Sequence, residues 1–153
     1  NLFDASTSYA GEWNIDEILD SINAKVIVIG VEHGGDKRID ELTPFKNQKY
    51  GGGKADDYLD FIVNILKPKV DATYRTKTNA KNTAIFGSSL GGLVSFYAAL
   101  KYPQVFGKVG CFSPAFWINK KEFINFNQYL SWKDSAAKHV LKNLIHPSLD
   151  VEL

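Results

Sequence analysis

The chain has 153 residues, of which 44% are hydrophobic and 23% are charged, so it can bury one core and favours a single domain spanning 1–153. Its formal net charge of +1 gives no electrostatic reason to expect a nucleic acid or an anionic membrane surface as partner. No apolar run approaches the length of a membrane span, and a single cysteine excludes an internal disulfide, so we expect a soluble protein stabilised by packing.

The first predicted elements are a helix, a strand and a long loop. The helix covers about residues 12–23, where Ile15, Ile18, Leu19 and Ile22 recur at helical spacing. The unbroken β-branched run Lys25–Val31 predicts a strand buried on both faces of a parallel sheet. The polar, glycine-rich stretch Glu32–Lys54 then predicts a long loop at the carboxyl end of that strand, where loops are commonly functional.

Helices and strands continue to alternate along the chain. A second amphipathic helix is predicted from about Ala55 and is stopped or kinked near Pro68. The further elements expected are a strand at 83–86, a helix after Ser89 that ends near Pro103, a strand at 106–112 and a helix at 133–145. This alternation predicts an open α/β sheet with helices on both faces.

The turn between the 83–86 strand and the next helix carries the most informative motif. Residues Gly87, Ser89 and Gly91 form a Gly-x-Ser-x-Gly pattern. A serine at such a strand-to-helix turn is the nucleophile elbow of hydrolases, in which tight crossing of strand and helix excludes side chains two residues either side. Ser89 is therefore the candidate nucleophile, and the backbone N–H of Leu90, at the helix start, is a candidate oxyanion donor. The reaction expected is acyl transfer from an ester through an acyl-enzyme.

Three segments meet at the same edge of the predicted sheet, outside the carboxyl ends of the strands. They are the loop after Val31, the Ser89 turn and the segment Ser113–Trp117. A nucleophile, glycines and aromatic residues on one edge predict a substrate pocket. The aromatic residues near Trp117 suggest a flat or sugar-linked substrate, although core packing would explain them equally well.

Six short motifs occur in a fixed order between residues 1 and 117: NLFD at 1–4, GEW at 11–13, VIGV at 28–31, HGG at 33–35, GSSLGG at 87–92 and FSPAFW at 112–117. Together they resemble the Putative esterase family, whose members include enterochelin esterases, S-formylglutathione hydrolases and carbohydrate esterases. The resemblance implies an α/β-hydrolase fold, a three-layer sandwich with a mostly parallel sheet. It also implies that Ser89 is the nucleophile and that the N–H of Leu90 binds the oxyanion, with a second donor at or just before Asn1. Ser88, His33 and Trp117 are the candidate substrate-binding residues.

The general base is not identified. The histidines are His33, His139 and His146. In the family the strand before His33 lies about 10 Å from the nucleophile strand, too far for a hydrogen bond, so His33 is expected to be a pocket wall or a solvated loop residue. His146, with Asp134 as its acid, follows the hydrolase order of nucleophile, acid and base, but a histidine at the end of a helix is equally explained by the helix dipole.

The motifs predict no cofactor and no metal, because no Cys or His cluster has ligand spacing and the glycines at 51–53 lack the pattern of a phosphate-binding loop. The expected partner is a small-molecule or carbohydrate-linked ester. The alternative is a catalytically incomplete hydrolase-like domain that serves as a binding or scaffold module. The chain begins with Asn1 and contains no methionine, so we expect a processed N-terminus, a fragment or omitted residues. The resemblance implies strands before residue 1 and after Trp117 that are not recognisable here, so the fold is expected to be incomplete at both ends; the oligomeric state and the compartment stay open.

Overall fold

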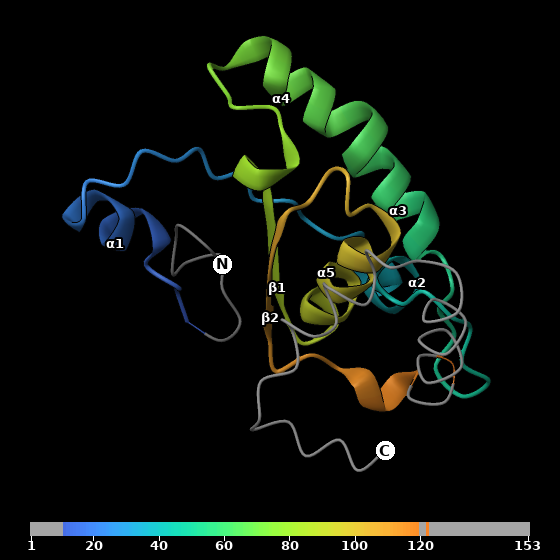
Figure 1. Ribbon diagram of the computed structural model, residues 1–153. Coiled ribbons are helices and arrows are strands. Elements are labelled where there is room, and N and C mark those ends of the chain that lie inside the picture. The colour runs from blue at the N-terminus through green and yellow to red at the C-terminus, as the bar shows by residue number, and fades with distance from the viewer. Residues whose placement is uncertain (1–10, 120–121, 123–153) are drawn as a thin grey trace. The chain divides into compact units, whose positions relative to one another are not determined.

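The computed structural model describes residues 11–119 and 122 (Figure 1). The chain divides into two units, Asn1–Glu32 and His33–Leu153, and each is described by itself. Within the described residues, no helix is long and apolar enough to cross a membrane.

Residues 11–32, the described part of the first unit, contain one helix, α1 (Ile15–Ser21), which confirms the helix predicted over 12–23 at a shorter length. Its Ile18 and Ile22 side chains are exposed. The strand predicted over Lys25–Val31 is wrong for this structure, because that segment is irregular and its side chains are exposed. A strand requires a neighbour to accept and donate its backbone hydrogen bonds, and β-branched residues favour strands only where such a neighbour and a packed face exist.

The second unit is an α/β arrangement with a small parallel sheet. Its elements in chain order are η2 (Gly35–Lys37), α2 (Arg38–Leu42), α3 (Ala55–Phe61), η3 (Ile62–Leu66), α4 (Lys67–Thr73), η4 (Ala80–Asn82), β1 (Ala84–Ser88), α5 (Leu90–Lys101), β2 (Lys108–Phe112) and η5 (Phe116–Ile118). The strands at β1 and β2 and the helix between them confirm the three elements predicted around Ser89. The helix predicted at 133–145 lies outside the described residues.

The segment predicted as a long loop, Glu32–Lys54, is only partly a loop. It contains η2 and α2, and Leu42 and Thr43 at the end of α2 are buried. The Thr43 hydroxyl donates a 2.6 Å hydrogen bond to the carbonyl of Ile39, so its polar group is satisfied inside the core. Two apolar residues at helical spacing, Ile39 and Leu42, are sufficient to anchor this short helix although its other side chains are charged.

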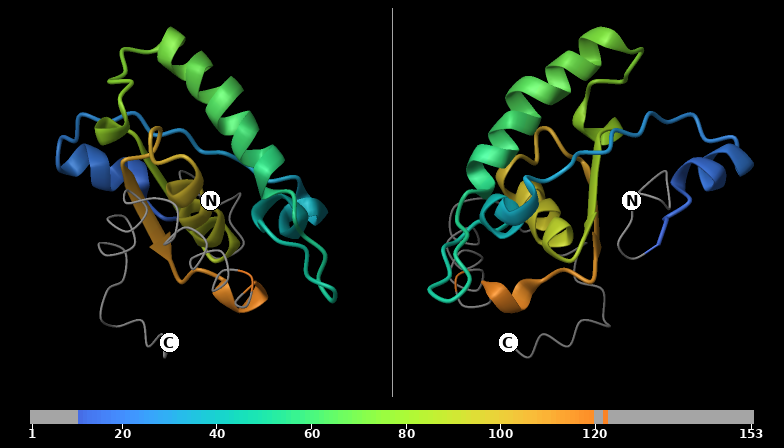
Figure 2. Two further views of the ribbon diagram at one scale, coloured as in Figure 1. Left: turned by 45° about the vertical axis from the view of Figure 1, so that its right-hand side comes forward. Right: turned by 180° about the vertical axis from the view of Figure 1, so that it is seen from behind.

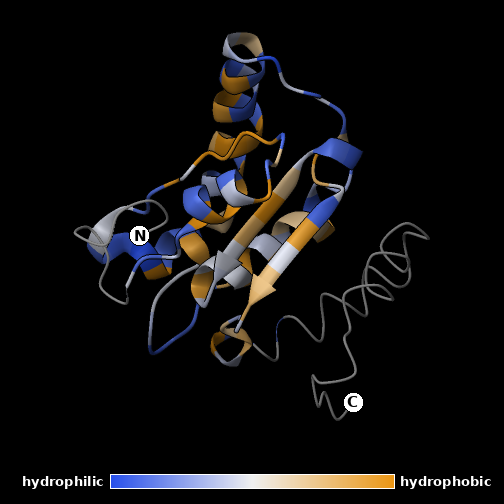
Figure 3. Ribbon diagram, turned by 90° about the vertical axis from the view of Figure 1, so that its left-hand side faces the viewer, coloured by the Kyte–Doolittle hydropathy of each residue, from blue (hydrophilic) through white to orange (hydrophobic). Residues whose placement is uncertain are grey.

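Strands β1 and β2 pair in parallel, with Ala84 opposite Lys108 and Ser88 opposite Phe112. Helix α5 packs against both strands and lies behind the sheet in Figure 3. Because side chains alternate along a strand, Ile85 packs on the core while Phe86 points to the other face. On that other face Phe86 is 61% exposed and Phe112 is 50% exposed. Among the described residues of the second unit, helices thus cover one face of this sheet only.

The core of the second unit lies between α2, α3, α5 and η5. Its fully buried large side chains include Leu59 of α3 and Leu93 of α5. Burial of one such leucine contributes about 1.5–3 kcal/mol relative to exposure, so α5, which has most of its residues buried, is the central element.

Helices α3 and α4 form one long helix through the π-helical segment η3 (Figure 2). The sequence predicted a stop or kink near Pro68, but the helix continues past it to Thr73. A proline cannot donate the backbone hydrogen bond of a regular α-helix, and a π segment placed just before it changes the hydrogen-bond register at that point.

Polar contacts join α3 to α5 at the end away from the Ser89 turn. The Tyr97 hydroxyl donates a 2.9 Å hydrogen bond to Asp56 Oδ1, and Lys101 Nζ lies 2.6 Å from the same oxygen. The Tyr102 hydroxyl donates to Asp60 Oδ1. Asp56 and Asp60 thus accept hydrogen bonds that hold α3 against α5 and the residue that follows it.

Candidate active site

Ser89 occupies the turn between β1 and α5 in a strained conformation. Its φ is 56° and its ψ is −119°, a backbone conformation that non-glycine residues rarely adopt. Such a conformation costs about 1–3 kcal/mol and persists only where the surrounding structure holds it. The Ser89 side chain is exposed and does not cap α5. Its hydroxyl is therefore open to a ligand.

The glycines of the motif have unequal roles. A Cβ added at Gly87 would lie 2.3 Å from the backbone C and O of Gly91, so Gly87 can carry no side chain. A Cβ at Gly91 would meet nothing within 4 Å, so the prediction of a clash is wrong there. At Gly92 it would lie 3.1 Å from the carbonyl oxygen of Gly87 and 3.2 Å from that of Phe112. Tight crossing of strand and helix thus requires glycine at position 87 and restricts the side chain at position 92. The backbone of Gly91 is the part of α5 that approaches Gly87.

Two backbone hydrogen bonds fix the Ser89 turn to the segment that follows β2. The Ser89 N–H donates to the carbonyl of Phe112 at 3.0 Å, and the Ala115 N–H donates to the carbonyl of Ser89 at 3.0 Å. Both backbone polar groups of Ser89 are occupied in this way. The turn therefore depends on residues 112–115 for its geometry.

Leu90 is the first residue of α5, and its side chain is buried. The first N–H groups of a helix have no partner within the helix, and the helix dipole places partial positive charge there. The contribution of Leu90 to a site would therefore come from its backbone N–H. Ser88, the last residue of β1, is half-buried beside it.

Cys111 of β2 is half-buried. Burial raises the pKa of its thiol to about 11. At neutral pH it is a protonated thiol and a weak nucleophile. The Ser89 side chain is thus more accessible than the Cys111 thiol.

His33 is exposed, and its imidazole Nδ1 accepts a 3.1 Å hydrogen bond from the N–H of Gly35. No hydrogen bond between His33 and Ser89 occurs within the part of the chain that the structure describes. This placement agrees with the expectation that His33 is not the general base. His139, His146 and Asp134 lie outside the described residues.

Trp117 of η5 is 64% exposed, and its indole meets the Tyr50 ring edge to face, with the ring centroids 5.4 Å apart and an interplanar angle of 86°. The sequence analysis did not single out Tyr50. The three glycines that follow Tyr50, at 51–53, indicate a turn, but a turn alone does not show which distant residue the Tyr50 ring contacts.

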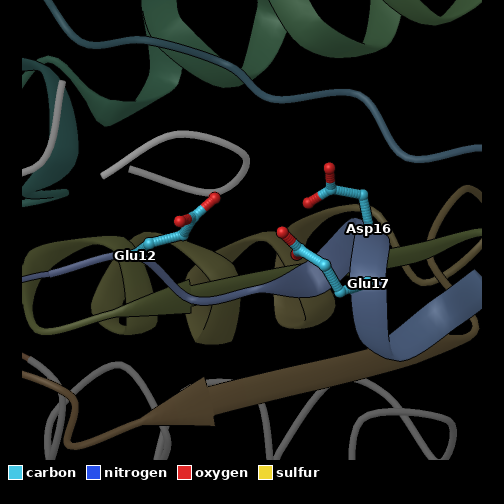
Figure 4. Close-up of side chains that lie close together, drawn as sticks. All are labelled: Glu12, Asp16 and Glu17. Atoms are coloured by element: carbon cyan, nitrogen blue, oxygen red, sulfur yellow. The ribbon is translucent and has the colours of Figure 1, made fainter. Parts of the chain in front are cut away.

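Three carboxylates gather in the first unit at the start of α1: Glu12, Asp16 and Glu17 (Figure 4). One oxygen from each lies within 4.8 Å of the others. Asp16 and Glu17 occupy the first turn of α1, where negative charge complements the helix dipole. This local role is sufficient to explain the cluster.

Comparison with known proteins places the chain in a family. The family model described as Putative esterase matches residues 1–152. The chain therefore belongs to the Putative esterase family, as the resemblance of its motifs indicated.

Several curated proteins match parts of this chain. The uncharacterized protein YbbA of Bacillus subtilis (strain 168) is 33% identical in an alignment 149 residues long that covers 82% of this chain and 59% of the relative. A siderophore enterobactin esterase of Emericella nidulans is 33% identical over 79 residues, 52% of this chain and 25% of the relative. A siderophore triacetylfusarinine C esterase of Aspergillus fumigatus is 39% identical over 69 residues, 45% of this chain and 23% of the relative. The matches thus span about three fifths of YbbA and about a quarter of the two fungal esterases.

Solved structures resemble the fold. The BES protein from Bacillus cereus superposes with a TM-score of 0.57 at 24% sequence identity, over 68% of this chain and 40% of that chain. The siderophore hydrolase EstA from Aspergillus nidulans superposes with a TM-score of 0.51 at 25% identity, over 72% of this chain and 41% of that chain.

Proposed function

We propose that the protein is a serine carboxylic-ester hydrolase in which Ser89 is the nucleophile. The observation that carries this proposal is the strained, exposed Ser89 at the turn from β1 to α5. A fold retains a conformation of this cost where a function requires the side chain to project from the turn. Membership of the Putative esterase family supports the same reaction.

The proposed reaction proceeds through an acyl-enzyme. The Ser89 Oγ attacks the carbonyl carbon of the ester, a general base takes the hydroxyl proton, and the alcohol leaves with a proton from that base. The N–H of Leu90, helped by the positive end of the α5 dipole, stabilises the oxyanion, and the second donor comes from the segment at or before Asn1. Water then attacks the acyl-enzyme and releases the acid. His146, with Asp134 as its acid, is the candidate base, while Ser88, His33 and Trp117 contact the substrate.

The proposed substrate is a small-molecule or carbohydrate-linked ester. Two curated relatives and one solved structure are named for the hydrolysis of siderophores, which favours a siderophore ester within this class. The backbone N–H groups at the Ser89 turn can stabilise the oxyanion, so the proposed mechanism requires no metal or cofactor.

We place the site in a single α/β-hydrolase domain with a three-layer sandwich and a mostly parallel sheet. The exposed Phe86 and Phe112 on the face opposite α5 support a further layer there, because aromatic side chains of a sheet are ordinarily covered.

The test uses the whole protein with a fluorophosphonate probe and with 4-nitrophenyl acetate. We expect one equivalent of label and ester turnover in the wild type, and neither in Ser89→Ala. Ser21→Ala is the control, since it removes an exposed serine hydroxyl of α1, outside the proposed site, and should still be labelled. Full turnover by Ser89→Ala would refute the site assignment. A folded wild type that neither labels nor turns over an ester would favour the alternative, a hydrolase-like binding or scaffold module.

A further inference from the structure

Tyr50 and Trp117 form an exposed aromatic corner on the second unit. Their rings are nearly perpendicular, with centroids 5.4 Å apart, and the two residues are 40% and 64% exposed. In an edge-to-face pair the two ring planes enclose an angle, so a flat group can stack on the face of one ring while it touches the other. Two large aromatic side chains that contact each other and yet stay exposed make a continuous apolar surface, which is unusual without a binding role.

Tyr50 is held in place by a tight turn. The backbone groups of Asn47 and Gly51 exchange hydrogen bonds of 2.7 and 2.9 Å, which closes the turn that carries Tyr50. Inside it, Asn47 Oδ1 accepts hydrogen bonds from the N–H of Lys49 at 2.9 Å and of Tyr50 at 3.2 Å. The exposed ring of Tyr50 therefore projects from an ordered backbone, and less conformational entropy is lost when a ligand binds it.

The turn is also fastened to the segment that carries Trp117. Asn47 Nδ2 donates a 2.8 Å hydrogen bond to the carbonyl of Ile118, and Asn119 Nδ2 donates a 3.0 Å hydrogen bond to the carbonyl of Phe45. Asn119 is fully buried. Asn47 thus bonds both the turn of Tyr50 and the backbone next to Trp117, and it sets the two rings against each other.

The aromatic corner is fixed relative to the nucleophile. The N–H of Ala115 donates to the carbonyl of Ser89 at 3.0 Å, and Trp117 follows two residues later. Since consecutive Cα atoms are 3.8 Å apart, the Trp117 Cα lies at most about 12 Å from the Ser89 carbonyl oxygen. The Phe116 ring, between them in sequence, packs edge to face on Phe96 of α5 with centroids 5.1 Å apart. The aromatic corner and the Ser89 turn thus belong to one short, hydrogen-bonded stretch of the chain, which is the basis for assigning them to one site.

From this geometry we infer that Tyr50 is a specificity-determining residue of the Ser89 site. Together with Trp117 it binds an aromatic ring of the substrate, and Asn47 is the residue that positions Tyr50. This inference rests on the proposed function and adds a substrate class to it. The esters preferred carry a planar ring close to the ester group, on its acyl or its alcohol side.

The test compares flat and saturated rings of the same size. Benzyl acetate and cyclohexylmethyl acetate place the ring on the alcohol side, and ethyl phenylacetate and ethyl cyclohexylacetate place it on the acyl side. We expect the wild type to prefer the flat ring in at least one pair. Tyr50→Ala should lower that preference roughly three- to tenfold, the effect of losing one ring contact, through KM rather than kcat. Tyr50→Phe, which keeps the ring, should retain it, and Asn47→Ala should lower it as Tyr50→Ala does.

Tyr74→Ala is the matched control, because Tyr74 is also an exposed tyrosine but follows the end of α4. It should leave all four rates unchanged. The inference is overturned if Tyr50→Ala lowers the rates for flat and saturated rings equally, or leaves both unchanged, in a protein that still labels at Ser89.

A binding measurement distinguishes a failure of this inference from a failure of the proposed function. In a Ser89→Ala background, saturation-transfer NMR should show tighter binding of the flat member of the preferred pair, and adding Tyr50→Ala should abolish the difference. If the wild type hydrolyses no ester but this difference is present, the proposed function fails and the aromatic site stands. Equal binding of flat and saturated rings in both pairs refutes the aromatic site.

Discussion

A Cβ on Gly87 would lie 2.3 Å from the backbone of Gly91, although a Cβ on Gly91 would meet nothing within 4 Å. The two glycines of one motif are therefore separable by mutation. Gly87→Ala should destabilise the protein by about 1–3 kcal/mol or more, since the added methyl forces the β1–α5 turn to open. Gly91→Ala should be neutral or stabilise by up to about 1 kcal/mol, because alanine favours a helix over glycine. Urea unfolding of both variants measures this, and equal losses would contradict it.

The strain at Ser89 predicts that function costs stability at this position. Ser89→Gly should abolish labelling and raise the free energy of unfolding, because glycine adopts a positive φ without the 1–3 kcal/mol penalty that other residues incur at about this geometry. The gain is reduced by about 0.5–1 kcal/mol, the cost of the greater freedom of glycine in the unfolded chain. Ser89→Ala keeps the strain and should be less stable than Ser89→Gly. A stability order with Ser89→Ala above Ser89→Gly would show that the turn is not strained.

The contact of Tyr97 with Asp56 predicts a modest contribution to the packing of α3 on α5. Tyr97→Phe removes the hydroxyl that donates to Asp56 Oδ1 and should destabilise by about 1 kcal/mol. The ring stays in place, so ester specificity should not change. Thermal unfolding together with the four ester rates checks both statements. Tyr58→Phe is a suitable control, since Tyr58 packs against the same core, and it should lower the stability less than Tyr97→Phe does.

The raised pKa values of the Tyr97 and Tyr102 hydroxyls predict a loss of stability at alkaline pH. Burial, followed by the hydrogen bond from its hydroxyl to Asp60 and the charges of Asp60 and Asp56, raises the pKa of Tyr102 from 10.0 to about 12. Burial and the bond to Asp56 raise the pKa of Tyr97 as well. The unfolded chain therefore releases these protons first, so the contribution of both tyrosines is fully present below pH 10. The contribution of Tyr102 is lost as the pH rises through about 12, and that of Tyr97 is lost at still higher pH. Urea unfolding between pH 9 and 12 should show a smaller decline in the Tyr97→Phe/Tyr102→Phe variant than in the wild type.

The raised pKa of Cys111 predicts low reactivity. With its thiol pKa near 11, the fraction of thiolate at pH 8 is small and the sulfur is half-buried. Iodoacetamide at pH 8 should modify the native protein slowly and the urea-unfolded protein rapidly. Cys111→Ala should retain fluorophosphonate labelling, which separates the thiol from the proposed nucleophile.

The parts of the fold that the sequence predicted are those in which neighbouring segments pack on each other. Strand β1, helix α5 and strand β2 follow one another and form their own contacts, so hydrophobic pattern and turn chemistry were sufficient. Lys25–Val31 has the same β-branched pattern, but pattern does not supply a partner strand. Helix α2 was missed because only Ile39 and Leu42 of its five residues are apolar, too few for a recognisable period.

The candidate site shows the same limit. The motif identified Ser89 and Leu90 because a turn of this kind is a local property of the chain. Tyr50 could not be found in this way, because its contact with Trp117 joins segments far apart in sequence. The amides that fasten them, Asn47 and Asn119, are ordinary loop residues until the fold brings each opposite a distant carbonyl.

The π-helical segment Ile62–Leu66 makes the direction in which the α4 face points depend on the number of residues before it. A π turn accommodates an extra residue, and one residue of a regular α-helix corresponds to about 100° of rotation. Deletion of a single residue within 62–66 would give an uninterrupted α-helix in which the face of Lys67–Thr73 is turned by about that angle. The orientation of Lys67–Thr73 is thus encoded by one surplus residue, and homologues that lack it would present a different side of this helix to solvent.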